Sequence, residues 1–132
     1  MKNIISVLLL ICAIVLSSCS NKRGGKPKVL VFSKTMGWKH KSIPAGIAAL
    51  EKMGAEKKFE IDTTKNGDLF NEDNLKQYSA VVFLNTTLNV LNAQQEAAFE
   101  RYIQSGGGFV GIHAAADTEY DWGWYNKLVG AQ

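Results

Sequence analysis

The sequence contains almost no cysteine. Its only two cysteines, Cys12 and Cys19, lie within the first 19 of 132 residues. The rest of the chain therefore has no disulfide, no thiolate metal site and no cysteine nucleophile. Any chemistry in the body of the protein must rest on other side chains.

Phosphate-binding loops are also missing. The glycine run Gly106–Gly108 precedes a short apolar run, whereas nucleotide-binding fingerprints follow a strand and open a helix. No such loop follows the apolar run that ends at Phe32. Binding of a nucleotide or a redox flavin is therefore disfavoured.

Long hydrophobic runs are absent except at the N-terminus. Ile4–Leu16 follows the basic Lys2 and leads into Leu16-Ser-Ser-Cys19. This run is too short for a membrane-spanning helix and predicts an export signal over residues 1–19. Residues 16–19, Leu-Ser-Ser-Cys, match a bacterial lipobox, so Cys19 is predicted to carry lipid. The alternative is an ordinary secretory signal with an incidental cysteine. Lipidation would anchor the protein to a membrane in the bacterial cell envelope, facing the periplasm or the outer surface.

Excess positive charge is confined to the start of the chain. The formal net charge is +3, but Lys2 belongs to the leader and four basic residues lie in 20–28, a predicted flexible tether. From Val29 onward ten Lys and Arg face twelve Asp and Glu. This mildly acidic body does not indicate nucleic acid as a partner.

Apolar runs alternate with helical patterns through the body. Strands are predicted at 29–32, 59–63, 80–84 and 109–112, helices at 43–53, 71–78 and 93–105, and an aromatic loop at 120–125. This order favours an α/β fold with a parallel sheet and right-handed crossovers. The strands at Val29 and Phe109 are apolar throughout and are expected to be central, with the alternating strand at Phe59 outside them.

Polar segments follow three of the predicted strands, at 33–40, 85–87 and 113–117. Open α/β sheets bind ligands outside the carboxyl ends of their strands, so these segments are expected to converge on one site. They carry the only two histidines of the chain, His40 and His113. The two rings are predicted to lie within about ten ångströms, the reach of one small-molecule pocket.

His113 and Asp117 are the predicted catalytic residues. A histidine at a strand tip can transfer protons, and an acidic neighbour can orient or charge it; the competing interpretation is a hydrogen-bonded structural histidine. On a helix the two residues, four apart, would share a face and with His40 could bind a divalent metal. No other cofactor is indicated.

The substrate-binding residues are predicted to come from the same segments and from the aromatic loop. Four aromatic residues between Tyr120 and Tyr125 would stack on the apolar face of a sugar, or would simply pack in the core. The predicted substrate-binding set is His40, Trp38, Asn85, Thr86, Trp122 and Trp124.

The chain resembles the ThuA-like (trehalose utilisation) family over residues 29–132. The resemblance rests on 29–32 with 37–40, on 81–87, on 95–102 and above all on 106–122, continuing to Gly130. It implies a flavodoxin-like three-layer α/β sandwich with a parallel sheet, as in class I glutamine amidotransferases. Those enzymes place a cysteine nucleophile where this chain has His113, so amidotransferase activity is not expected. Family members continue beyond this point, which implies an incomplete domain.

The resemblance links the chain to carbohydrate metabolism. The leading expectation is an exported lipoprotein that acts on a saccharide, such as trehalose or a related glycoside or keto-sugar, as a hydrolase or isomerase. The alternative is a non-catalytic carbohydrate-binding module.

Overall fold

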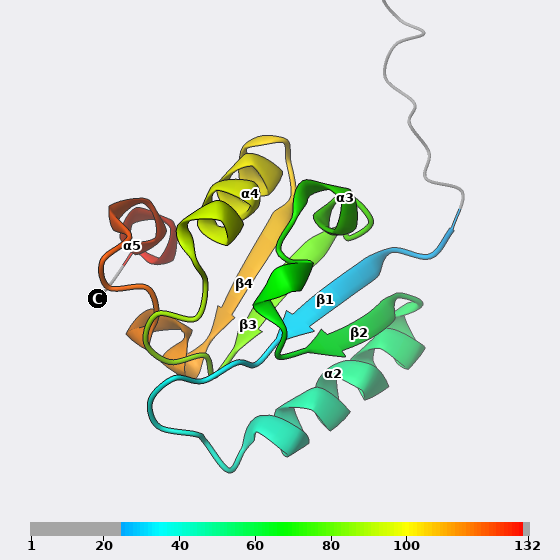
Figure 1. Ribbon diagram of the computed structural model, residues 1–132. Helices are drawn as coiled ribbons and strands as arrows, with labels where there is room; N and C mark the ends of the chain where they lie inside the picture. Colours follow the sequence, from blue (N-terminus) through cyan, green and yellow to red (C-terminus); the bar gives the residue numbers. More distant parts are fainter. Residues whose placement is uncertain (1–24, 131–132) are drawn as a thin grey trace, which may run out of the picture.

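The sheet of the computed structural model, which describes residues 25–130, has four strands. They are β1 (Lys28–Phe32), β2 (Glu60–Thr64), β3 (Ala80–Leu84) and β4 (Gly108–Ile112). All neighbouring pairs are parallel, and the order across the sheet is β2-β1-β3-β4 (Figure 1). The predicted export signal 1–19, Cys19 and residues 20–24 of the tether lie outside the described residues. Strand β1 begins at Lys28, one residue before its predicted start, because Lys28 already pairs with β2.

Helices cover both faces of the sheet. One face carries α2 (Ile43–Lys57), and the other carries α3 (Glu72–Leu75), α4 (Ala93–Gln104) and α5 (Gly123–Val129) (Figure 1). Two short 3₁₀ turns, η1 (Gly67–Leu69) and η2 (His113–Asp117), follow the tips of β2 and β4. This is the expected three-layer, flavodoxin-like arrangement. No helix in the described part of the chain is long and apolar enough to cross a membrane.

The core is divided in two by the sheet because side chains of a strand alternate between its faces. Leu30, Phe32 and Phe83 point to the side of α3, α4 and α5, where they join a large aromatic cluster. Val31 and Val82 point to the side of α2. Because β1 and β3 are buried on both faces, their sequences are continuous apolar runs.

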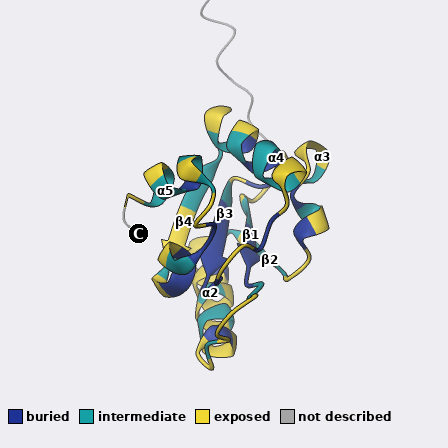
Figure 2. Cartoon of the chain, turned by 60° about the vertical axis from the view of Figure 1, so that its left-hand side comes forward, coloured by how far each residue is buried: buried dark blue, intermediate teal, exposed yellow. Residues whose placement is uncertain are grey.

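The predicted central position of the fourth strand is wrong in the part of the chain that the structure describes. There β4 is an edge strand, β1 and β3 are central, and β2 lies outside β1 as predicted. Figure 2 shows β3 in the buried colour and β4 mostly in intermediate and exposed colours. Val110 remains 47% exposed because no described helix covers it. An apolar run alone cannot distinguish a central strand from an edge strand.

The helix boundaries show where local signals succeed and where packing overrides them. At α4 a capping box is present, in which the side chains of Asn92 and Gln95 each accept a hydrogen bond from the other's backbone N–H. In contrast, α2 runs through Gly54 to Lys57. A Cβ at Gly54 would lie 2.8 Å from the carbonyl oxygen of Phe59, so this glycine permits close packing and does not end the helix.

The expected aromatic loop is partly a helix. Residues Gly123–Val129 form α5, which ends at Gly130 in the left-handed conformation. Tyr125 is fully buried, and Leu128 and Val129 pack against the same cluster. Contact with that cluster stabilises a seven-residue segment that would be marginal as a helix in isolation.

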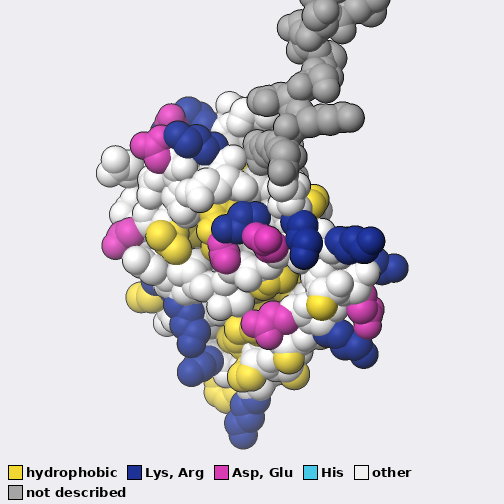
Figure 3. All heavy atoms as spheres, turned by 90° about the vertical axis from the view of Figure 1, so that its right-hand side faces the viewer, with side chains coloured by type: hydrophobic (Ala, Val, Ile, Leu, Met, Phe, Trp, Pro, Cys, Tyr) yellow, Lys and Arg dark blue, Asp and Glu magenta, His cyan; other side chains and the backbone are white. Residues whose placement is uncertain are grey.

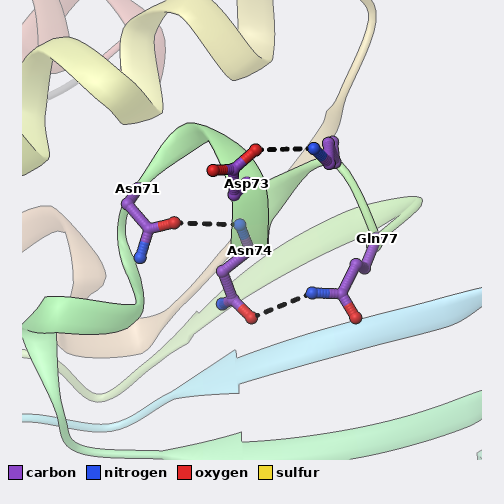
Figure 4. Close-up of polar contacts among 5 residues, drawn as sticks. Asn71, Asp73, Asn74 and Gln77 are labelled. Atoms are coloured by element: carbon purple, nitrogen blue, oxygen red, sulfur yellow. Dashed lines mark hydrogen bonds and ion pairs between the residues drawn. The ribbon is translucent and has the colours of Figure 1, made fainter.

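The short helix α3 is held by its own polar side chains (Figure 4). Asn71 caps it by accepting a hydrogen bond from the backbone N–H of Asn74 at 2.9 Å, and Gln77 donates to the Asn74 side chain at 3.3 Å. Lys76 pairs with Asp73 at 2.6 Å. On the face shown in Figure 3, basic and acidic side chains are interspersed and neither sign forms a continuous patch.

Candidate functional site

The two histidines lie side by side at the carboxyl ends of the strands. Their ring centroids are 4.7 Å apart, with an interplanar angle of 73°, in an edge-to-face arrangement. This confirms the expectation that they lie within ten ångströms. His40 comes from the segment after β1 and is half-buried, whereas His113 directly follows β4 and is exposed. Among the described residues, no hydrogen bond occupies a ring nitrogen of either histidine.

Asn85 connects the two histidine-bearing segments. Its side-chain amide donates to the Ser42 hydroxyl at 3.1 Å, two residues after His40. Its backbone N–H donates to the carbonyl of Ile112, the residue before His113, at 3.2 Å. Three strand tips are therefore joined at one place, as the sequence predicts. Ser42 precedes α2 but makes no cap hydrogen bond, because its hydroxyl accepts the bond from Asn85 instead.

The side chain of Asn85 has an unused acceptor. It is only 4% exposed, and its Oδ1 atom is buried without a hydrogen-bond partner. Rotating the amide by half a turn would satisfy Oδ1 with the Ser42 hydroxyl and leave Nδ2 unpaired instead. Since a buried polar atom without a partner costs about 1–3 kcal/mol, this position is suited to receive a ligand atom.

Both Asn85 and His113 have left-handed backbone conformations, with φ of 52° and 53°. Asparagine adopts this region readily, but histidine does so much less often. Such conformations cost about 1–3 kcal/mol and cluster at functional sites. At His113 the sharp turn from β4 into η2 brings the imidazole to the sheet edge.

The sheet order places the site at a topological switch point. The chain passes from β1 to β2 on one side and then returns to β3 on the other, so the reversal lies between β1 and β3. A crevice is expected there. From the sequence, the crevice is instead expected between the loops that follow the first and the fourth strands. That assignment is corrected, because β3 separates β1 from β4.

Asp117 lies near the site but does not contact His113. Its carboxylate accepts a hydrogen bond from the Tyr120 hydroxyl, and its backbone carbonyl accepts from Leu88 N–H at 2.8 Å. No hydrogen bond or ion pair joins it to His113 within the described residues. The intervening segment is a 3₁₀ turn, in which residues four apart point about 120° away from each other. The two side chains therefore do not share a face, as they would on an α-helix.

The predicted metal set is not assembled. Within residues 25–130, no group of three or more His, Cys, Asp or Glu side chains is placed to hold a metal ion. The rings of His40 and His113 are in contact, but the Asp117 carboxylate is hydrogen-bonded to Tyr120.

Trp38 and Thr86 differ sharply in their exposure. Trp38 is 73% exposed in the segment that leads to His40. Thr86 is fully buried, and its hydroxyl is 2.8 Å from the hydroxyl of Thr118. The neighbouring Thr87 hydroxyl accepts from Gly37 N–H and donates to the Trp38 carbonyl. These threonines tie the strand tips together.

Trp122 and Trp124 pack at a different place. Their rings stack at a centroid distance of 5.0 Å, and both rings contact Phe99 of α4. Each tryptophan is half-buried. They belong to the cluster on the α4 face of the sheet, and neither ring contacts a histidine in the described structure.

Among the described residues, Glu119 is an acidic residue that is buried and that the sequence does not single out. It is 1% exposed and has a left-handed φ of 55°. One carboxylate oxygen accepts from the backbone N–H groups of Val90 at 2.8 Å and Leu91 at 2.7 Å. Burial raises the pKa of this carboxyl, and the nearby charge of Glu96, whose own pKa is also raised by burial, adds to the effect. A single glutamate in a polar stretch gives no sequence signal of this environment.

A hollow of about 410 Å³ lies in the surface between α3 and α4, away from the histidines. Its polar lining includes Asp68, Glu72, Gln95 and Arg101. These side chains already bond one another, through Arg101 with Glu72 and Gln95 with Asp68.

The family model for ThuA, described as trehalose utilisation, matches residues 28–132. The chain belongs to the ThuA family. A solved structure of a ThuA-like protein from Bacteroides uniformis is similar, with 26% sequence identity and a TM-score of 0.67. That match covers 85% of this chain and 47% of the other protein, so the chain spans about half its relative's length. A comparison with curated proteins gave no match.

Proposed function

We propose that this ThuA-family chain binds a saccharide at the strand tips, with His40, Asn85 and His113 as the central residues. The observation that carries the proposal is the edge-to-face pair of histidines, 4.7 Å apart, beside a buried amide with an unused hydrogen-bonding atom. Sugar hydroxyls donate and accept hydrogen bonds, which matches imidazole nitrogens and a carboxamide. The family description, trehalose utilisation, favours trehalose or a related glycoside or keto-sugar as the ligand.

In the enzymatic form of the proposal, His113 exchanges a proton with a sugar hydroxyl or a glycosidic oxygen. The ring of His40 lies 4.7 Å from that of His113, so one neutral imidazole can accept a proton while the other donates one. Asp117 contributes through its charge, and the Tyr120 hydroxyl, which donates to its carboxylate, holds it in place. A hydrolase and an isomerase both need this proton transfer.

A non-catalytic carbohydrate-binding module is the second proposal, and the stacked tryptophans favour it. Trp122 and Trp124 are half-buried, so part of each ring stays accessible to a sugar. Tyr125 is fully buried and cannot contribute a stacking face. In this form the ligand surface lies on the α4 side of the sheet, away from the histidines.

Saccharide binding and turnover by paired variants test the two forms. With trehalose and a panel of glycosides and keto-sugars, the enzymatic form predicts that His113→Ala abolishes turnover while much of the binding remains. The module predicts no turnover by the wild type and loss of binding in Trp122→Ala or Trp124→Ala. Met53→Ala, at an exposed apolar position on α2, serves as the control for the latter pair. Absence of both binding and turnover with every sugar would reject the proposal.

We also propose that the protein is a lipoprotein of the bacterial cell envelope. The support is the sequence of residues 1–19, which ends in a lipobox at Cys19, followed by a basic, glycine-containing tether. A lipid anchor would hold the saccharide site facing the periplasm or the outer surface.

A further inference from the structure

We propose that His40 and His113 bind one divalent first-row transition metal ion, with the side-chain oxygen of Asn85 as a third donor. Use of this ion in chemistry on a sugar rests on the proposed function, whereas the binding itself does not.

The spacing of the two rings suits a shared ion. Zn²⁺ binds histidine nitrogens at about 2.0–2.1 Å in a tetrahedral arrangement. Adding the distance from the bound nitrogen to the ring centre places the centroids of two imidazoles on one such ion about 5 Å apart. The observed centroid distance is 4.7 Å.

Both imidazoles are available to a metal. Their ring nitrogens make no hydrogen bond to any described residue, and His113 is exposed. A pair of protonated histidines at this distance would repel, whereas a metal requires both rings in the neutral form. The paired ring of His113 also belongs to a residue with a left-handed backbone, with φ of 53°.

Asn85 provides the independent indication of a ligand. It is 4% exposed, and its Oδ1 atom is buried without a partner. The residue lies between the two histidine segments, bonded to Ser42 on one side and to Ile112 on the other. A cation is a natural partner for this oxygen.

The donor set indicates the class of metal. Two imidazoles and one amide oxygen suit zinc, nickel, cobalt or copper ions, whereas magnesium and calcium prefer sets made of oxygen alone. No carboxylate or thiolate completes the set in the described residues. The ion therefore keeps open coordination positions, as catalytic sites do and structural sites do not.

Zinc titration by calorimetry tests the site, using the full chain without a polyhistidine tag and with Cys12→Ser and Cys19→Ser to remove competing thiols. We expect one equivalent of Zn²⁺ to bind, and Co²⁺ to give visible absorption typical of a low-coordinate site. His40→Ala and His113→Ala should each weaken zinc binding by at least about tenfold, which is one decade in Kd. Lys39→Ala, an exposed neighbour of His40, is the matched control and should bind as the parent does.

Asn85→Asp tests the third donor, because it adds charge without changing shape and tolerates the same backbone conformation. Zinc affinity should rise at least about threefold; an unchanged affinity excludes Asn85 as a ligand.

No binding at about 1 mM zinc, or equal binding in the double histidine variant, overturns the site. Saccharide binding to the metal-free protein separates the two ideas. A sugar that binds when zinc does not leaves the proposed function standing, and zinc binding without any sugar affinity rejects the saccharide site while supporting the metal.

Discussion

The buried carboxyl group of Glu119 lies near that of Glu96, and this like charge adds to burial in raising the pKa of Glu119. A carboxyl group beside a like charge holds its proton more tightly. Glu119 also accepts the N–H groups of Val90 and Leu91 and thereby holds the loop between β3 and α4. That loop begins at Asn85, so the buried Glu119 helps to hold the candidate site in place.

Substitutions at Glu119 should separate hydrogen bonding from charge. Glu119→Gln keeps an oxygen for both backbone N–H groups and offers an amide donor to Glu96, so the free energy of unfolding at pH 7 should fall by less than about 1 kcal/mol, or rise. Glu119→Ala leaves two buried N–H groups without a partner and should cost about 3 kcal/mol. Urea unfolding measures both. Equal losses in the two variants would contradict the assigned contacts.

The same residue should make stability depend on pH. Burial raises the pKa of the Glu119 carboxyl above its ordinary value of 4.5. The folded state therefore holds this proton more tightly than the unfolded state does. The resulting stabilisation is fully present below about pH 4.5 and is lost as pH rises through the raised pKa. The unfolding free energy of wild type minus that of Glu119→Gln should fall over this range; a difference that rises with pH would refute the assignment.

Two glycines should respond oppositely to alanine. At Gly107 a Cβ would lie 2.3 Å from the ring of Tyr102, so Gly107→Ala should lower the free energy of unfolding by about 1–3 kcal/mol. At Gly123, the first residue of α5, nothing lies within 4 Å of an added Cβ. Gly123→Ala should therefore raise stability by up to about 1 kcal/mol. Thermal unfolding of both variants is the measurement, and each is the other's control.

Thr86 should matter to stability more than to ligand binding. Its hydroxyl is fully buried beside that of Thr118. Thr86→Val removes this hydrogen bond while keeping the shape and should cost about 1–2 kcal/mol. Saccharide affinity, measured by calorimetry well below the melting temperature, should stay within about twofold of wild type, less than 0.5 kcal/mol. Normal stability with a large loss of affinity would make Thr86 a contact residue.

The lipid anchor is tested by fractionation. Cys19→Ser should move the protein from the membrane fraction into the soluble fraction, because the acyl chains that bind the bilayer are then absent. Cys12→Ser is the matched control and should leave the protein with the membranes. Membrane association that survives Cys19→Ser would rule out anchoring through this residue.

Local sequence signals were sufficient for much of the fold. The apolar runs predicted all four strands to within one residue, because a short apolar segment buried on a sheet has few other stable arrangements. The capping box at Asn92 and Gln95 is also a local feature of the sequence, since both partners lie within one helical turn. The histidine pair followed from a rule on parallel sheets, because the carboxyl ends of their strands lie at one edge.

Sequence by itself thus determined which segments are strands, that the strands run parallel, and that His40 and His113 share an edge. Tertiary structure alone decided that β4 lies outside β3, that η2 is a 3₁₀ turn turning Asp117 away from His113, and that Glu119 is buried. These outcomes depend on contacts between residues far apart in the chain, such as Glu119 with Val90. Local propensity carries no information about such contacts, because their energy appears only when the layers pack together.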